Sequence, residues 1–254
     1  MLDSIVTNLL DFANKFASHA SEVLIAFAAI GALTMAILQT IKDLTPVRSI
    51  FNKAKVTNWL NRQQTRPHGA TLQQAMANAP DGLTDLLILS TAAHEAALFD
   101  LELERLAGQI SAAAGIVVDY PERHAKLLWA LAASAEEADI AILVTAAQGG
   151  YLQLRNLQAA QPDQYDELLA AKIRVTHQVQ RNIDGFQIST AFTWKVYVQY
   201  ASFIVSFVLT GIALTLSTAS FGLAVILLVG LAAGFFAPIA RDLVAILDKA
   251  RRAS

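Results

Sequence analysis

The sequence predicts an all-α integral membrane protein with three membrane-spanning helices and a cytosolic helical bundle between the first span and the second. Three apolar stretches without a charged residue carry this prediction, at residues 23–41, 196–217 and 221–240. Each is about 20 residues long, which is enough for a helix to cross the hydrocarbon core of a bilayer. The composition agrees, because 55% hydrophobic residues and a mean hydropathy of +0.44 are high for a soluble domain.

Residues 1–22 are expected to form an external amphipathic segment, since apolar residues recur there at helical spacing. This segment could lie on the membrane surface or simply extend the first span. Within the span at 23–41, Ala28, Ala32 and Ala36 recur every four residues. Small residues at this spacing let a second helix approach closely, so we expect a helix-packing face.

Residues 42–66 contain six basic residues and one acidic residue. An apolar stripe accompanies the bases at Val47, Ile50, Phe51, Ala54 and Trp59. Together they predict a juxtamembrane amphipathic helix on an anionic leaflet. The bases expected to contact lipid headgroups are Arg48, Lys53, Lys55 and Arg62. In the alternative interpretation these bases only mark the cytosolic side of the membrane.

Residues 67–193 are predicted to be an acidic, cytosolic helical domain, with fifteen acidic and seven basic residues. This excess of negative charge disfavours nucleic acid as a partner. Abundant alanine favours helices, including one over 83–98 and a long last helix that starts near Pro162. We expect a break in that last helix at Gly185 before the chain enters the membrane.

Residues 194–240 are predicted to be a transmembrane hairpin. In its first helix, five polar residues form one continuous stripe: Gln199, Ser202, Ser206, Thr210 and Ser217. Such a stripe can bond a neighbouring helix or line a pore made by several subunits. In its second helix, Gly230 and Gly234 form a close-approach motif for another helix.

The distribution of basic residues predicts an external N-terminus and an internal C-terminus, with residues 241–254 as a basic cytosolic tail. The basic clusters then share one side of the membrane, as three spans require. We expect a multi-pass protein of the bacterial inner membrane, in contact with the anionic lipid of its inner leaflet.

No motif for catalysis, a cofactor or a metal is recognised, and the chain contains no cysteine. His94-Glu95 begins like a zinc-protease motif, but Leu98 stands at the second ligand position. The sequence therefore predicts no enzyme and no cofactor. An enzyme at the membrane face would need His94, His124 or His177 in a pocket with carboxylates.

The function expected from these features is an oligomeric membrane assembly. Its cytosolic domain would receive a signal or a partner, and its spans could open a pore. The alternative is a membrane-anchored scaffold or adaptor that recruits a cytosolic protein. The small-residue faces favour a homo-oligomer, although they could also pack within one subunit.

Overall fold

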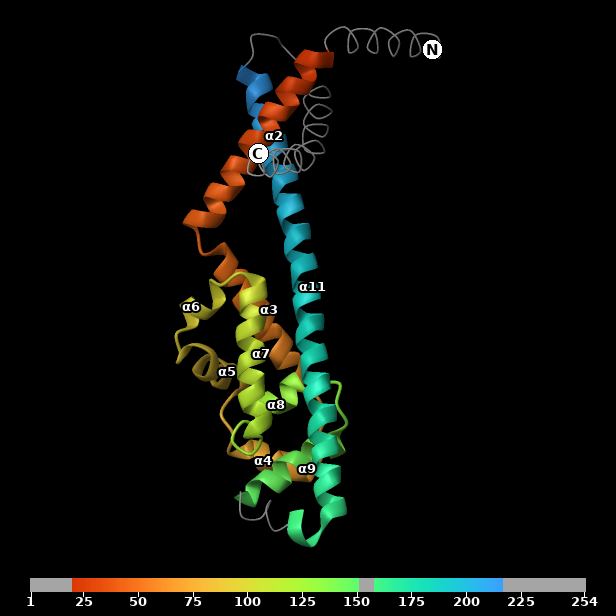
Figure 1. Cartoon of the computed structure of the whole chain (residues 1–254). Coiled ribbons are helices and arrows are strands. Elements are labelled where there is room, and N and C mark those ends of the chain that lie inside the picture. The colour runs from red at the N-terminus through yellow and green to blue at the C-terminus, as the bar shows by residue number, and fades with distance from the viewer. Residues whose placement is uncertain (1–19, 151–157, 217–254) are drawn as a thin grey trace, which may run out of the picture. The chain divides into compact units, whose positions relative to one another are not determined.

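The computed structural model describes residues 20–150 and 158–216, and within these ranges the chain is helical and has no β-strand (Figure 1). The all-α prediction is therefore confirmed for this part of the chain. Its helices are α2 (Ala20–Leu44), α3 (Val47–Gln64), α4 (Ala70–Ala77), α5 (Gly82–Thr91), α6 (Glu95–Phe99), α7 (Leu103–Asp119), α8 (Ala125–Leu131), α9 (Glu137–Gln148) and α11 (Pro162–Leu216).

The chain divides into two compact units. Unit 1 comprises Met1–Thr45 and Trp194–Ser254, and unit 2 comprises Pro46–Thr193. The end of unit 2 coincides with the predicted end of the soluble domain at residue 193. Its start does not, because unit 2 begins at Pro46 rather than at residue 67. Unit 2 therefore includes the basic helix that the sequence assigned to the membrane surface.

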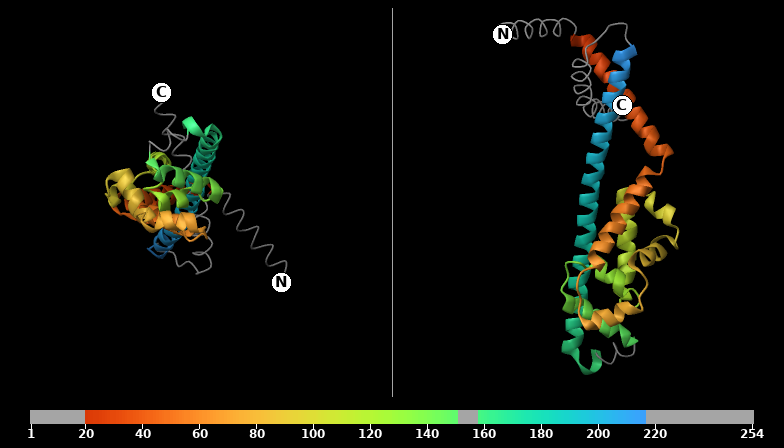
Figure 2. Two further views of the ribbon diagram at one scale, coloured as in Figure 1. Left: turned by 90° about the horizontal axis from the view of Figure 1, so that it is seen from below. Right: turned by 180° about the vertical axis from the view of Figure 1, so that it is seen from behind.

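The core of unit 2 is built around α8. From Ala125 to Ala132, every residue except Lys126 is at most 2% exposed. A helix that is apolar on all sides must be covered on all sides. Helices α3, α4, α5, α7 and α9 contact α8, and the end-on view of Figure 2 shows the short helices of unit 2 gathered together.

Helix α3 packs on this core with a different face from the predicted one. Its buried residues are Asn52, Val56 and Leu60, whereas Val47 and Ile50 of the predicted stripe are exposed. The Asn52 side chain donates to the carbonyl of Phe99 at 2.9 Å and to that of Leu101 at 3.0 Å. These bonds satisfy a buried amide and fix α3 to the end of α6.

The predicted helix over 83–98 is two helices in the structure, α5 and α6. Ala92 and Ala93 separate them, with φ angles of 51° and 69°. The left-handed Ala92 ends α5, and its N–H bonds the carbonyl of Ile88. This conformation costs an L-residue roughly 1–2 kcal/mol, which packing around the turn must offset.

Helix α11 is continuous over 55 residues, so the expected break at Gly185 is wrong. In unit 2 its side chains Leu168, Val175, Val179, Ile183 and Phe186 belong to the hydrophobic core. The same helix continues into unit 1 from Trp194.

Among the described residues, one helix is long and apolar enough to cross a membrane, and it is the part of α11 that ends at Ala213. Only 17% of its most apolar window is buried, which distinguishes it from the core helix of a soluble protein. The predicted span at 221–240 lies outside the described residues, and the three-span arrangement stays a prediction.

We predict that Gly185→Ala stabilises the protein. A Cβ added at Gly185 would meet no atom within 4 Å, and alanine is preferred to glycine inside a helix by about 0.5–1 kcal/mol. The free energy of unfolding, measured by circular dichroism of the full chain in detergent, should rise by this amount.

Gly150→Ala is the matched control, because Gly150 has a φ of +71° that alanine adopts only with strain. It should lower the free energy of unfolding. A loss of stability in Gly185→Ala would contradict the continuous helix.

Candidate functional site

The hydroxyl residues predicted as a stripe on α11 are buried within unit 1. Ser202, Ser206 and Thr210 are 3%, 0% and 1% exposed. Thr210 Oγ1 donates to the Ser206 carbonyl at 2.8 Å. The hydroxyls of Ser202 and Ser206 have no hydrogen-bond partner in the described part of the chain. Gln199, at the start of the stripe, is exposed, and Ser217 lies outside the described residues.

The small-residue faces are only partly described. Ala32 and Ala36 are exposed, and the buried residues of α2 beside them are Gly31 and Thr34. The alanine face is therefore not the packed face of α2 in the described chain. The side chain of Ala28 lies outside the described residues, as do Gly230 and Gly234.

The four predicted headgroup-binding bases all lie on α3. Lys53 Nζ pairs with Glu95 Oε1 at 2.6 Å, and both side chains are about half exposed. Lys55 Nζ lies 5.5 Å from the centroid of the Phe51 ring. Arg48 is half-buried and Arg62 is exposed.

The structure pairs His124 with Asp85, two residues that the sequence did not connect. His124 Nδ1 lies 2.8 Å and 3.0 Å from the two carboxylate oxygens of Asp85. The side chains are 15% and 4% exposed. Burial raises the pKa of Asp85, and the bond from His124 opposes that rise. The pair joins the first turn of α5 to the residue that precedes α8.

His94 and His177, the other two histidines considered for catalysis, have different surroundings. His94 precedes α6, and its Nδ1 accepts the N–H of Ala97 at 3.3 Å. It therefore caps a short helix. His177 is exposed on α11 and lines a pocket of about 290 Å³ with Glu136, Asp139 and Arg174.

A network of charges lies beside this small pocket. Arg174 makes two bonds to Asp139, at 2.7 Å and 2.9 Å, and one to Glu167 at 2.8 Å. The bonds from both carboxylates raise the pKa of Arg174. A bidentate arginine–carboxylate pair fixes side-chain geometry. This network therefore holds α11 against α9, and its role is best explained as structural.

A second group of polar atoms surrounds Trp129. The Arg66 guanidinium carbon lies 3.8 Å from the centroid of the Trp129 ring, and the His68 ring packs edge-on against it at 5.7 Å. Burial lowers the pKa of Arg66. The buried Arg66 Nη2, His68 Nδ1 and Trp129 Nε1 have no hydrogen-bond partner in the described ranges. The Arg66 guanidinium over the Trp129 ring and the edge-on His68 ring hold the α3–α4 connection on the core.

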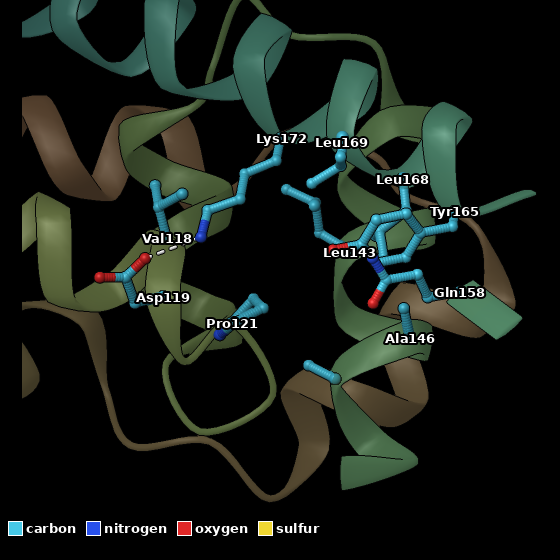
Figure 3. A pocket seen from close by; sticks show the side chains of 11 residues that line it. Val118, Asp119, Pro121, Leu143, Ala146, Gln158, Tyr165, Leu168, Leu169 and Lys172 are labelled. Atoms are coloured by element: carbon cyan, nitrogen blue, oxygen red, sulfur yellow. Dashed lines mark hydrogen bonds and ion pairs between the residues drawn. The ribbon is translucent and has the colours of Figure 1, made fainter. Parts of the chain in front are cut away.

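An open pocket of about 400 Å³ lies between the end of α7, the end of α9 and the start of α11 (Figure 3). Its walls are mostly aliphatic and come from Val118, Leu143, Ala146, Leu168 and Leu169. Polar groups stand on opposite sides of the opening in Figure 3. The Lys172–Asp119 ion pair, at 2.8 Å, is on one side.

Tyr165 and Gln158 are on the other side of this pocket. An apolar wall with a few polar groups at its rim is typical of sites that receive a small ligand or one side chain of a partner protein. No local pattern predicts this pocket, because most of its residues come from three helices that are distant in the chain.

Comparison of the chain with known protein families, with characterised proteins and with solved structures finds no match. In the described ranges, no group of three or more histidine, cysteine, aspartate or glutamate side chains is arranged to hold a metal ion.

We predict that the free energy of unfolding of the Asp85→Asn variant increases, relative to that of the natural chain, as pH rises. The raised pKa means that the folded state favours protonated Asp85. The protonated carboxyl group therefore makes its whole contribution to the free energy of unfolding below the ordinary aspartate pKa of about 3.9. That contribution is lost as pH rises through the raised pKa. Asparagine resembles the protonated carboxyl group and does not titrate.

Denaturation of both full chains in detergent, from about pH 4 to about pH 7, measures this difference. Circular dichroism at each pH establishes that both chains are folded. A difference in unfolding free energy that stayed constant with pH would contradict the burial effect.

Proposed function

We propose that the chain is a multi-pass membrane adaptor, which anchors a soluble helical unit at the cytosolic face of the membrane and presents it to a protein partner. The observation that carries this proposal is a reversal of polarity along α11. The same helix buries apolar residues in unit 2 and hydroxyl residues in unit 1.

In unit 2, α11 has the pattern of a soluble protein. Val175, Val179 and Ile183 are at most 3% exposed. Polar residues such as Gln180 and Asp184 are exposed. This arrangement places apolar groups away from water, as the hydrophobic effect requires.

In unit 1, α11 has the opposite pattern. Its buried positions are hydroxyl residues, while Ile204, Val208 and Ile212 are 60%, 50% and 50% exposed. Because residues two apart lie on nearly opposite faces of a helix, the two sets form separate rows. In water, the exposed row would cost about 25 cal/mol per Å² of apolar surface. In lipid it costs nothing, and the buried hydroxyls can join helices.

The flanking residues support the same placement. Tyr197 and Tyr200 precede Ser202, the first of the buried hydroxyl residues, and they are 55% and 66% exposed. Tyrosine is enriched where a span meets the headgroups. Helix α2 repeats the reversed pattern, with Thr34 fully buried and Leu33 52% exposed. Two helices with this pattern support more than one span.

The distribution of basic residues supports a cytosolic position for unit 2, and the surroundings of its histidines support an adaptor. His94 caps a helix, His124 pairs with Asp85, His177 is exposed beside a charge network, and the His68 ring packs edge-on against Trp129. The 400 Å³ pocket described above is suited to an aliphatic or aromatic side chain of a partner. We therefore assign partner recognition to unit 2 and anchoring to unit 1.

The pore hypothesis has less support. A pore-lining stripe must face a water-filled passage between subunits, whereas Ser202, Ser206 and Thr210 are already covered within one chain. The adaptor proposal expects no release of a trapped dye from liposomes that contain the purified chain. Reporter fusions at Pro80 and at the C-terminus should be active only with cytosolic reporters, and external activity at Pro80 would overturn the topology.

We predict that Ser206→Leu destabilises the protein by about 1–3 kcal/mol, because the larger side chain overfills a fully covered position. Thermal denaturation in detergent measures this loss. Ile204→Leu is the matched control, since Ile204 is 60% exposed and should tolerate the change. If liposomes did release dye, and Ser206→Leu abolished the release without loss of stability, the pore would replace the adaptor.

A further inference from the structure

The exposed apolar side chains of unit 2 include two pairs near the points where the chain enters and leaves it. Val47 and Ile50, in the first turn of α3, are 42% and 64% exposed. Ile188 and Phe192, in the last turns of α11 within unit 2, are 71% and 67% exposed. Each pair adjoins a boundary of unit 2, at Pro46 and at Thr193.

These two pairs lie at the same end of unit 2. Helices α3 and α11 run in opposite directions (Figures 1 and 2). They meet where the Trp59 and Phe186 rings stack with centroids 4.6 Å apart. Ile50 precedes Trp59 by nine residues and Phe192 follows Phe186 by six, so both lie about 9–14 Å from this stack in the same direction.

The charge of α3 suits an anionic surface. Residues 46–66 contain five basic residues and no acidic residue. Lys53 forms an ion pair with Glu95. Arg48 and Lys55, both half-buried, stand on the same two turns as the exposed Ile50 and on the other side of the helix. Farther along α3 the exposed residues are Asn58, Asn61 and the basic Arg62.

We propose that this end of unit 2 is a lipid-binding surface, in which Val47, Ile50, Ile188 and Phe192 insert among the headgroups and Arg48 and Lys55 bind anionic phospholipid. The inference rests on the proposed membrane placement of α11. The bilayer is the favoured occupant because the chain becomes a membrane span within a few residues of both apolar pairs. Apolar side chains beside bases are the usual composition of an interfacial helix.

The chain has no cysteine, so single cysteines can report on this surface without background. Ile50→Cys and Phe192→Cys, each labelled with bimane, are placed in nanodiscs that carry nitroxide-labelled lipid. The discs are made of phosphatidylcholine, with or without phosphatidylglycerol. Ile204→Cys is the reference for a lipid-facing span, and Ile88→Cys, on α5 and 52% exposed, is the control.

We expect lipid nitroxide to quench positions 50 and 192 nearly as strongly as position 204, and position 88 much less. Phosphatidylglycerol should increase quenching at position 50. Arg48→Gln with Lys55→Gln should reduce this lipid preference by roughly fivefold for each base. Arg123→Gln with Arg181→Gln, two exposed bases outside α3, changes the net charge equally and should leave the preference intact.

Quenching at position 204 without quenching at 50 and 192 would overturn the lipid-binding surface and leave the membrane placement standing. Absence of quenching at position 204 would overturn the membrane placement itself. Quenching at position 50 by a nitroxide on a second copy of the chain, but not by labelled lipid, would assign the surface to a protein contact. Equal quenching with and without phosphatidylglycerol would overturn the role of the bases.

Discussion

Unit 2 depends on the complete burial of α8. This helix has no polar face, and it is stable only because helices from both ends of the unit cover it. Helix α3 precedes it in the chain and α11 follows it, and the Asn182 side chain of α11 donates to the Leu131 carbonyl at the end of α8 at 2.9 Å. The hydrophobic effect thus joins the first and last helices of the unit through their shared contact with the middle one.

Helix α11 packs in the core of unit 2 and continues into unit 1 as one unbroken helix. It does so by changing which residue types occupy its covered face, from Val179 and Ile183 in unit 2 to Ser202 and Ser206 in unit 1. The backbone hydrogen bonds need not change at all, since a helix satisfies them internally in water and in lipid. Side-chain identity alone marks where the environment changes.

The sequence was sufficient for the features that depend on composition and local propensity. Alanine content indicated helices, which the described ranges show. Three features depend on tertiary contacts and could not be predicted. Val56 and Leu60 are buried because α8 covers that face of α3. Ala92 ends α5 in a left-handed conformation without glycine. Gly185 does not interrupt α11, because Ile183 and Phe186 on either side of it pack in the core.

The candidate sites divide in the same way. Helical periodicity groups Ser202, Ser206 and Thr210 on one face, which the structure buries, but periodicity cannot state whether such a face meets water or protein. Asp85 and His124 are 39 residues apart, and no local pattern links them. The pocket at Leu143 and Lys172 likewise exists only after three helices have met.

The contribution of α11 to the core has a consequence for synthesis on the ribosome. Translation proceeds from α2 to α11, so the segment that completes the core of unit 2 is also the segment that leads into the next apolar stretch. Until Val175, Ile183 and Phe186 emerge, the core around α8 lacks part of its cover and exposes apolar surface to water. Folding of unit 2 and synthesis of the apolar stretch that follows it are thus tied to the same few seconds of elongation.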